Sequence, residues 1–252
     1  MKLRSSALIF LSLVALSVIF LAAAAQPAQG GILTNASFET TSLASPGGYI
    51  CQTTGNSTCI SNIAGWSSTC NGNCGTSGTV ASVLYNGTGG SAFNGNRGLW
   101  AVSDSPDGNV YVAIDGDSTY SASISQALTG LTIGDTYTFT FDQAAAQQNG
   151  TNGATTEQWQ VSFSGQTQTS PMMSDLSHGF VAWSQVTMSF VATTTSTSLT
   201  FLALGTPHGG PPVVLLDGLT AAETPEPQTY ALVGLGLIGV PLALRYRRRK
   251  SR

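Results

Sequence analysis

The chain has 252 residues, enough for one sizeable domain, and a formal net charge of −3. Of its nine Lys and Arg residues, two lie among the first four positions and six follow residue 244, so that only Arg97 falls between. Ten of the twelve Asp and Glu residues lie between Glu39 and Asp217. Because nucleic-acid binding needs clustered basic side chains, this acidic central region argues against it and favours cations or neutral partners.

The first 30 residues have the three parts of a secretory signal peptide. Lys2 and Arg4 precede an apolar run from Ala7 to Ala25, and small residues follow it. Cleavage after Ala25 and cleavage after Gly30 both fit, and an uncleaved N-terminal anchor is the alternative. We therefore expect the Sec translocon and signal peptidase as partners and an oxidising compartment as the destination.

The cysteines form a group in a stretch rich in Gly, Ser, Thr and Asn. They are Cys51, Cys59, Cys70 and Cys74. Four cysteines allow three disulfide pairings, of which we favour the nearest-neighbour pairs, Cys51 with Cys59 and Cys70 with Cys74, because each closes a short loop. A four-cysteine zinc site is the alternative, but no Cys-x-x-Cys pair is present and export disfavours it.

Residues 31–220 show the period-two alternation of apolar and polar side chains that is typical of β-strands. The pattern is clearest in four segments, which are residues 136–141, 158–163, 186–190 and 199–203. Strands with one apolar face must bury that face against a second sheet. The pattern therefore predicts an all-β fold in which residues 31–220 form a single β-sandwich domain.

Several segments of this region resemble, in their order along the chain, the galactose-binding-like jelly-roll modules of bacterial carbohydrate-binding proteins. The segments are residues 32–39, 63–66, 105–108, 111–117, 124–126, 131–137 and 213–219. The resemblance implies that the first and last strands lie side by side and share a structural Ca²⁺ site. It implies Glu39 and Asp217 as the ligands, with Asn35 as a third. The alternative is that both carboxylates are solvated and bind no metal.

Tryptophan side chains are the candidates for stacking on sugar rings. Trp66 and Trp159 lie in alternating segments, so we predict that both belong to the core. Trp100 follows a stretch containing Gly and Asn and lies beside Arg97, the lone cation of the central region. These two residues are therefore the candidate ligand-binding pair.

Catalytic motifs are missing from the sequence. The two histidines, His178 and His208, lie in Gly-containing stretches that we interpret as loops, and neither Gly-x-Ser-x-Gly nor His-Glu-x-x-His occurs. The carboxylates that a glycosidase needs are present, but no pattern places a pair of them across a cleft. We therefore predict a non-catalytic protein, with a carbohydrate-active hydrolase as the least favoured hypothesis.

Residues 224–252 combine three physically different parts. Pro225, Glu226 and Pro227 form a stiff polar bracket, and an apolar run follows at about residues 230–244. This run is shorter than the roughly 20 residues of a comfortable membrane-spanning helix, and the positive charge after it should stay in the cytoplasm. The basic tail at residues 245–252 contains Arg245, Arg247, Arg248, Arg249, Lys250 and Arg252.

This order of parts resembles the PEP-CTERM tail of Gram-negative envelope proteins. The resemblance implies that exosortase, a membrane enzyme, reads Pro225, Glu226 and Pro227 and removes the tail. The inner membrane would then hold the precursor only transiently, and the protein would pass to the cell surface or to an exopolysaccharide (biofilm) matrix. A C-terminal anchor that is never cut is the alternative. The leading hypothesis is thus an exported envelope or matrix protein, and the second is a module that binds a specific polysaccharide.

Overall fold

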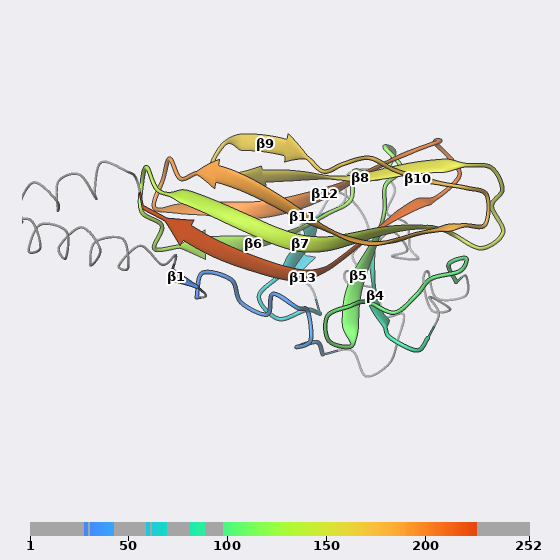
Figure 1. The fold of residues 1–252 in the computed structure, drawn as a ribbon, viewed down its shortest axis with the longest axis horizontal. Coiled ribbons are helices and arrows are strands. Elements are labelled where there is room, and N and C mark those ends of the chain that lie inside the picture. Colours follow the sequence, from blue (N-terminus) through green and yellow to red (C-terminus); the bar gives the residue numbers. More distant parts are fainter. Residues whose placement is uncertain are drawn as a thin grey trace, which may run out of the picture.

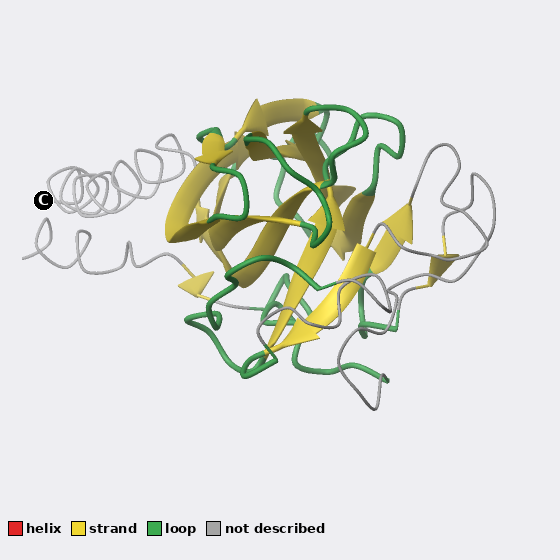
Figure 2. Ribbon diagram, turned by 90° about the vertical axis from the view of Figure 1, so that its right-hand side faces the viewer, coloured by secondary structure: helices red, strands yellow, loops and turns green. Residues whose placement is uncertain are grey.

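The structure is a computed structural model that describes residues 28–29, 31–42, 59–60, 62–69, 81–88 and 98–225. All regular elements in this part of the chain are β-strands, as Figure 2 shows. They form two antiparallel sheets that pack face to face (Figure 1). The all-β sandwich predicted from the alternation is therefore confirmed.

Within the described residues, the first sheet has its long strands at one side and the second has its long strands in the middle. The first sheet has the order β11 (Phe180–Val191), β7 (Thr136–Gln147), β13 (Pro212–Thr224), β5 (Val110–Asp115) and β4 (Ala81–Tyr85), and β1 (Ala28–Gln29) pairs with β13. The second has the order β10 (Met173–Asp175), β8 (Thr155–Phe163), β12 (Ser196–Thr206), β6 (Ser123–Thr129), β3 (Ser67–Thr69) and β2 (Cys59–Ile60), and β9 (Gln166–Thr169) pairs with β8. Successive strands from β5 to β8, and again from β11 to β13, alternate between the sheets, which is the jelly-roll arrangement.

The alternation predicted for β7 and β8 decides which side chains form the core between the sheets. At the start of β7, Tyr137, Phe139 and Phe141 are fully buried, and the threonines between them face outwards. Trp66 and Trp159 are 1% and 0% exposed, so the prediction that both are core residues is confirmed. The Trp159 side chain also links the sheets, because its Nε1–H donates to the carbonyl of Leu215 in β13 at 3.0 Å.

A second apolar cluster lies on the opposite face of the first sheet. Along β5, Val112 faces the core between the sheets, whereas its neighbour Tyr111 points to the other face and is also buried. The chain itself covers this face: Trp183 packs edge-on against Tyr111 with ring centroids 5.5 Å apart, and its Nε1–H donates to the carbonyl of Ser103. Both faces of the first sheet are therefore buried around β5.

Several predicted features lie outside the described residues. They are residues 1–27 of the signal peptide, Cys51, Cys70, Cys74, Arg97, Glu226, Pro227, the apolar run at 230–244 and the basic tail at 245–252. Residues 28–29, also within the predicted signal peptide, form β1 and pair with β13. Cys59 lies in β2, whose side chains the structure does not describe. The described ranges contain no helix that is long and apolar enough to cross a membrane.

Candidate functional site

Glu39 connects the beginning of the domain to strand β5. Its Oε1 accepts hydrogen bonds from the backbone N–H groups of Asn109, at 2.6 Å, and Val110, at 2.8 Å. Gly108 has a φ of +56°, and a Cβ at this position would collide with the Glu39 carboxylate. Glycine is therefore required both for the backbone conformation and for the close approach of the carboxylate.

Asp217 lies in the centre of β13 and is fully buried. Only one of its two carboxylate oxygens has a hydrogen-bond partner. The Ser105 hydroxyl donates to Oδ2, whereas Oδ1 has no hydrogen-bond partner. Burial is the main reason that the pKa of Asp217 rises to about 8; hydrogen bonds from Ser105 and Gly218 oppose this, and the charges of Asp107 and Glu39 add to it. The raised pKa means that no positively charged side chain of the described residues balances the Asp217 carboxylate.

Two further carboxylates lie beside Asp217. Asp142 of β7 stands directly opposite Asp217 in the strand register, next to a bulge between Asp217 and Thr220. Burial, together with the charge of Asp107, raises the pKa of Asp142. Like charges in directly opposed positions destabilise a sheet, and the described part of the chain contains no Lys or Arg to balance them. The orphan oxygen of Asp217 among these carboxylates therefore fits a bound cation.

Asn35, the third predicted ligand, is engaged in its own turn. Its side-chain N–H groups donate to the carbonyls of Thr40, at 2.9 Å, and Ala64, at 3.1 Å, and its Oδ1 accepts from the Thr40 N–H at 2.8 Å. The fit to a cation consequently depends on Glu39 and Asp217. Within the described residues, no group of three or more His, Cys, Asp or Glu side chains could hold a metal ion by itself, so carbonyl oxygens or water would complete the coordination.

Trp100, the predicted ligand-stacking residue, lies at the end of β7 where three loops meet. Its ring stacks on that of His178, with centroids 4.4 Å apart and planes inclined by 35°. Both loops are fastened to Gln147, because Trp100 N–H donates to its carbonyl at 2.9 Å and His178 N–H donates to its Oε1 at 3.0 Å. The ring of Trp100 is half-buried, and its Nε1–H is buried without a partner.

Amide side chains flank this aromatic pair. Gln148 Nε2 and Asn149 Oδ1 are buried and also lack partners, and Asn152 Oδ1 lies 2.7 Å from His178 Nε2. Aromatic rings together with a few convergent amides are the groups that line sites for polar organic ligands. The sequence predicted Trp100 as a ligand-binding residue and His178 as a loop residue, but not their contact or the role of Gln148 and Asn149, because these contacts join loops far apart in the chain. The position of Arg97 lies outside the described residues.

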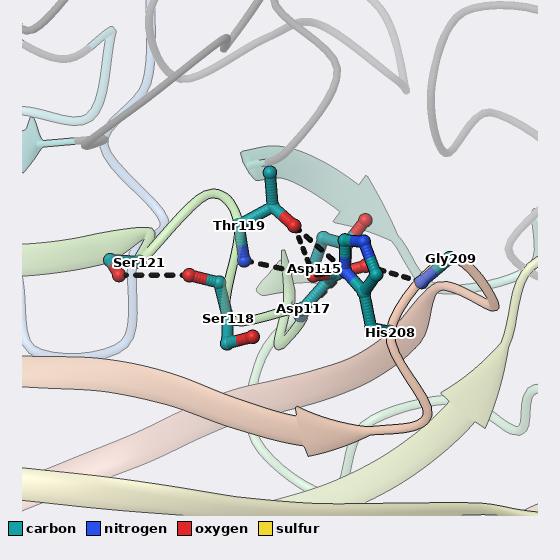
Figure 3. A network of polar contacts seen from close by, with 7 residues as sticks. All are labelled: Asp115, Asp117, Ser118, Thr119, Ser121, His208 and Gly209. Carbon is teal, nitrogen blue, oxygen red and sulfur yellow. Dashed lines mark hydrogen bonds and ion pairs between the residues drawn. The ribbon is translucent and has the colours of Figure 1, made fainter.

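A separate polar network surrounds Asp117 (Figure 3). Asp117 Oδ1 accepts from the Thr119 N–H at 2.9 Å and lies 2.8 Å from His208 Nδ1, and Oδ2 accepts from the Gly209 N–H at 2.6 Å. Burial alone would raise the pKa of Asp117, but the hydrogen bonds from Gly209, Thr119 and His208 outweigh it and lower the pKa below its usual range. The network joins the turn after β5 to the turn after β12.

Neither this network nor the buried pair of Glu157 and Asp175 has the arrangement of a Ser-His-Asp hydrolase or of a glycosidase. Thr119 Oγ1 and Asp117 Oδ1 both contact the same nitrogen of His208, whereas a Ser-His-Asp relay uses the two different ring nitrogens. Glu157 and Asp175 interact with each other but are only 0% and 2% exposed. A polysaccharide therefore has no access to them, unlike the open pair of a glycosidase.

The C-terminal end of the chain matches a known family of sorting motifs. Residues 223–249 match the family model of the PEP-CTERM protein-sorting motif. The chain carries a PEP-CTERM sorting motif. This sorting motif confirms the resemblance that the three parts of the tail indicated, and it begins within the last two residues of β13. No curated protein matches the chain.

Solved structures of carbohydrate-binding modules are similar to the chain at low sequence identity. TmCBM61 in complex with β-1,4-galactotriose is 14% identical, with a TM-score of 0.42 over 76% of this chain and 97% of its own. A sugar-binding protein from Bacteroides thetaiotaomicron, named putative in its description, is 14% identical, with a TM-score of 0.39 over 77% and 100%. The family 22 module of Clostridium thermocellum Xyn10B is 15% identical, with a TM-score of 0.37 over 64% and 87%. The fold of this chain is established by its own strand order.

The Asp117 network predicts a pH-dependent contribution to stability. Because the folded pKa is depressed, the stabilisation is present above the unfolded value of 3.8 and is lost as the pH falls through the folded pKa. At pH 7, the substitution Asp117→Asn should lower the free energy of unfolding by about 2–4 kcal/mol, since several charge-assisted hydrogen bonds weaken. Urea unfolding at pH 7 and in increasingly acidic buffers below pH 4 measures this difference.

The matched control is Asp104→Asn, since Asp104 is exposed and accepts a hydrogen bond from the Gly87 N–H. It should change the unfolding free energy by well under about 1 kcal/mol. A gap between wild type and Asp117→Asn that stays the same at both pH values would show that the charge of Asp117 does not stabilise the fold.

Proposed function

We propose that the chain is an exported, non-catalytic protein of the cell envelope or of an exopolysaccharide matrix, sorted and processed by exosortase. The PEP-CTERM sorting motif at residues 223–249 is the observation that carries this proposal. The precursor would be held in the inner membrane of a Gram-negative bacterium by the apolar run at 230–244 and by the basic residues after it. Removal of the tail would then release the body towards the surface.

The end of the last strand supports processing without unfolding. Glu223 and Thr224 of β13 still pair with Tyr137 and Thr136 of β7, and the Tyr137 hydroxyl donates to Glu223 Oε1 at 2.8 Å. Pro225 follows directly, and a proline has no N–H with which to continue the ladder. The recognition residues Pro225, Glu226 and Pro227 thus begin where the sheet ends, so a cut beyond them leaves every strand of the body intact.

Substitution of the recognition residues tests this proposal. Replacing Pro225, Glu226 and Pro227 together by alanine should leave the tail attached and the protein in the inner-membrane fraction. A C-terminal epitope tag, followed by immunoblotting of cell fractions, should be lost from the wild-type protein and kept by the substituted one. Gln228→Ala is the matched control and should behave as wild type. Equal loss of the tag from the triple variant, or from wild type in cells without exosortase, would refute the proposal.

The carboxylates of Glu39 and Asp217 support a structural Ca²⁺ between the first segment and the last strand. Calcium takes hard oxygen ligands, and it would supply the positive charge that the orphan Oδ1 of Asp217 lacks. When bound, the ion would tie the two ends of the domain together. Glu39 would hold it while keeping its bonds to the start of β5, because each carboxylate oxygen has more than one lone pair.

Calcium removal should therefore destabilise the protein. A ligand present at about one hundred times its dissociation constant adds about 2.7 kcal/mol of stability, which corresponds to a melting temperature several degrees higher. Added EDTA should lower the melting temperature by that amount, and added calcium should restore it. In Asp217→Asn, the response to EDTA should shrink, whereas Asp104→Asn should respond as wild type. An unchanged response in Asp217→Asn would remove Asp217 as a ligand.

Binding of a polysaccharide is a second candidate function, favoured by the Trp100 pair and its amides. A sugar ring stacked on Trp100 would find Gln148, Asn149 and Asn152 next to the same loop. Of these amides, Asn152 is exposed, whereas the unpartnered polar atoms of Trp100, Gln148 and Asn149 are buried and would reach a sugar only if the loops shifted.

A glycan array, followed by titration of the best glycan, tests the second function. Trp100→Ala should weaken binding by about 2 kcal/mol, or roughly thirtyfold in Kd, as loss of a central aromatic anchor does. Trp183→Ala removes another half-buried tryptophan that lies against Tyr111, and it should leave binding unchanged. Wild-type binding that survives Trp100→Ala, or the absence of any bound glycan, would contradict this function.

A further inference from the structure

One end of the inter-sheet core is unexpectedly polar. Strand β8 keeps its alternation from Thr155 to Phe163, so Thr155 and Glu157 lie on the same inward face as Trp159. Glu157 is 0% exposed, and neither Oε1 nor Oε2 has a hydrogen-bond partner. Burying a carboxylate that no hydrogen bond satisfies costs a large amount of free energy.

Asp175 of β10 brings a second carboxylate to the same place. It stands directly opposite Thr155 in the β8–β10 register, which puts it diagonally beside Glu157. It is 2% exposed. A backbone hydrogen bond from Leu176, in the turn that follows, lowers the pKa of Asp175, and Oδ1 lies against Gly179 in the same turn. The other oxygen, Oδ2, has no partner.

Two neutral side chains on β8 and on β7 of the facing sheet add further buried oxygens at this end of the core. Thr155 lies close enough to lower the pKa of Glu157, but its Oγ1 forms no hydrogen bond of acceptable geometry. Gln143 of β7 donates through Nε2 to the carbonyl of Pro171, at 3.2 Å, directly before β10 begins. Its Oε1 is left without a partner. Thr155 and Gln143 are 3% and 1% exposed, so both are buried as deeply as the carboxylates.

The chemistry of these atoms points to a positively charged occupant. Five oxygens from Glu157, Asp175, Thr155 and Gln143 are buried without a hydrogen-bond partner, and the Thr155 hydroxyl is the one O–H among them. Burial, with the charge of Asp175, raises the pKa of Glu157 to about 8, which shows how strongly the site resists two bare negative charges. One shared proton satisfies two of these oxygens at most. A hard cation attracts all of them, and no Lys or Arg of the described residues competes for the place.

We propose that Glu157, Asp175, Thr155 and Gln143 form a buried calcium site, separate from the one at Glu39 and Asp217. Two carboxylates balance the charge of one Ca²⁺, while the hydroxyl and amide oxygens are ligand types that calcium accepts. The ion would clamp β8, β10 and β7 together at the end of the sandwich nearest the Trp100 loops. The site does not depend on the sorting motif or on sugar binding.

The number of calcium ions bound per chain tests this site. Isothermal titration of the purified, metal-stripped full-length protein with calcium chloride should show two ions for wild type. Glu157→Gln and Asp175→Asn should each bind one, as should Asp217→Asn, whereas Glu157→Gln combined with Asp217→Asn should bind none. Asp135→Asn is the matched control, because Asp135 is also buried but lies at the opposite end of β7, and it should keep wild-type stoichiometry.

The proposal is overturned if Glu157→Gln binds as many ions as wild type, or if wild type binds only the ion that Asp217→Asn loses. If wild type binds no second ion and Glu157→Gln melts at a higher temperature than wild type, a proton shared by Glu157 and Asp175 occupies the site instead. Terbium luminescence covers the case in which the Glu157 variants fail to fold. In Asp217→Asn, terbium should gain at least tenfold in emission excited through Trp159, two residues from Glu157, and no gain would also overturn the site.

Discussion

The described body of the protein has to accommodate buried carboxylates without any lysine or arginine side chain. Where backbone N–H groups are available, they take the place of cations: Glu39 accepts two of them at the start of β5, and Asp117 accepts those of Thr119 and Gly209. Such charge-assisted bonds stabilise the ionised form and fix loops to strands. Asp217 accepts hydrogen bonds from Ser105 and Gly218 but keeps Oδ1 unpartnered, and both carboxylate oxygens of Glu157 are unpartnered, which directs attention to solvent cations.

The same separation of charge suits an exported chain. The basic residues are concentrated at the two ends, the second of which lies in the sorting motif, and the region between them is acidic. Under the proposals above, a body whose described residues contain no Lys or Arg would take up calcium after export. Calcium bound at Glu39 and Asp217 would join the first described segment to the last strand, whose end at Thr224 leads directly into the sorting motif. Folding and sorting would thus be completed at the same side of the membrane.

Sequence periodicity predicted the long strands well, because the faces of β7 and β8 alternate strictly between apolar and polar side chains. It also placed Trp66 and Trp159 in the core. The second apolar cluster was not predicted, since Tyr111 is buried on the outer face only because the segment around Ser103 folds over it. No local pattern encodes such a covering.

The sequence predicts the polar sites at Glu157 and Trp100 to different extents. Glu157 carried a signal that was overlooked: it falls on the same face as Trp159, where an apolar residue is expected. Its partner Asp175 becomes visible only through strand pairing. Likewise, Trp100 was identified as a candidate, but its stacking on His178 joins residues 78 positions apart, and loop-to-loop contacts of this kind follow from tertiary packing alone.

Native mass spectrometry of the mature protein recovered from the cell surface tests the central claim, that an acidic, cation-dependent body is delivered between two removable basic ends. The account predicts a polypeptide mass without the signal peptide and without the tail beyond the sorting tripeptide, increased by bound calcium. A mass that still includes Arg252, or a folded protein of mature mass that carries no metal ion, would contradict it.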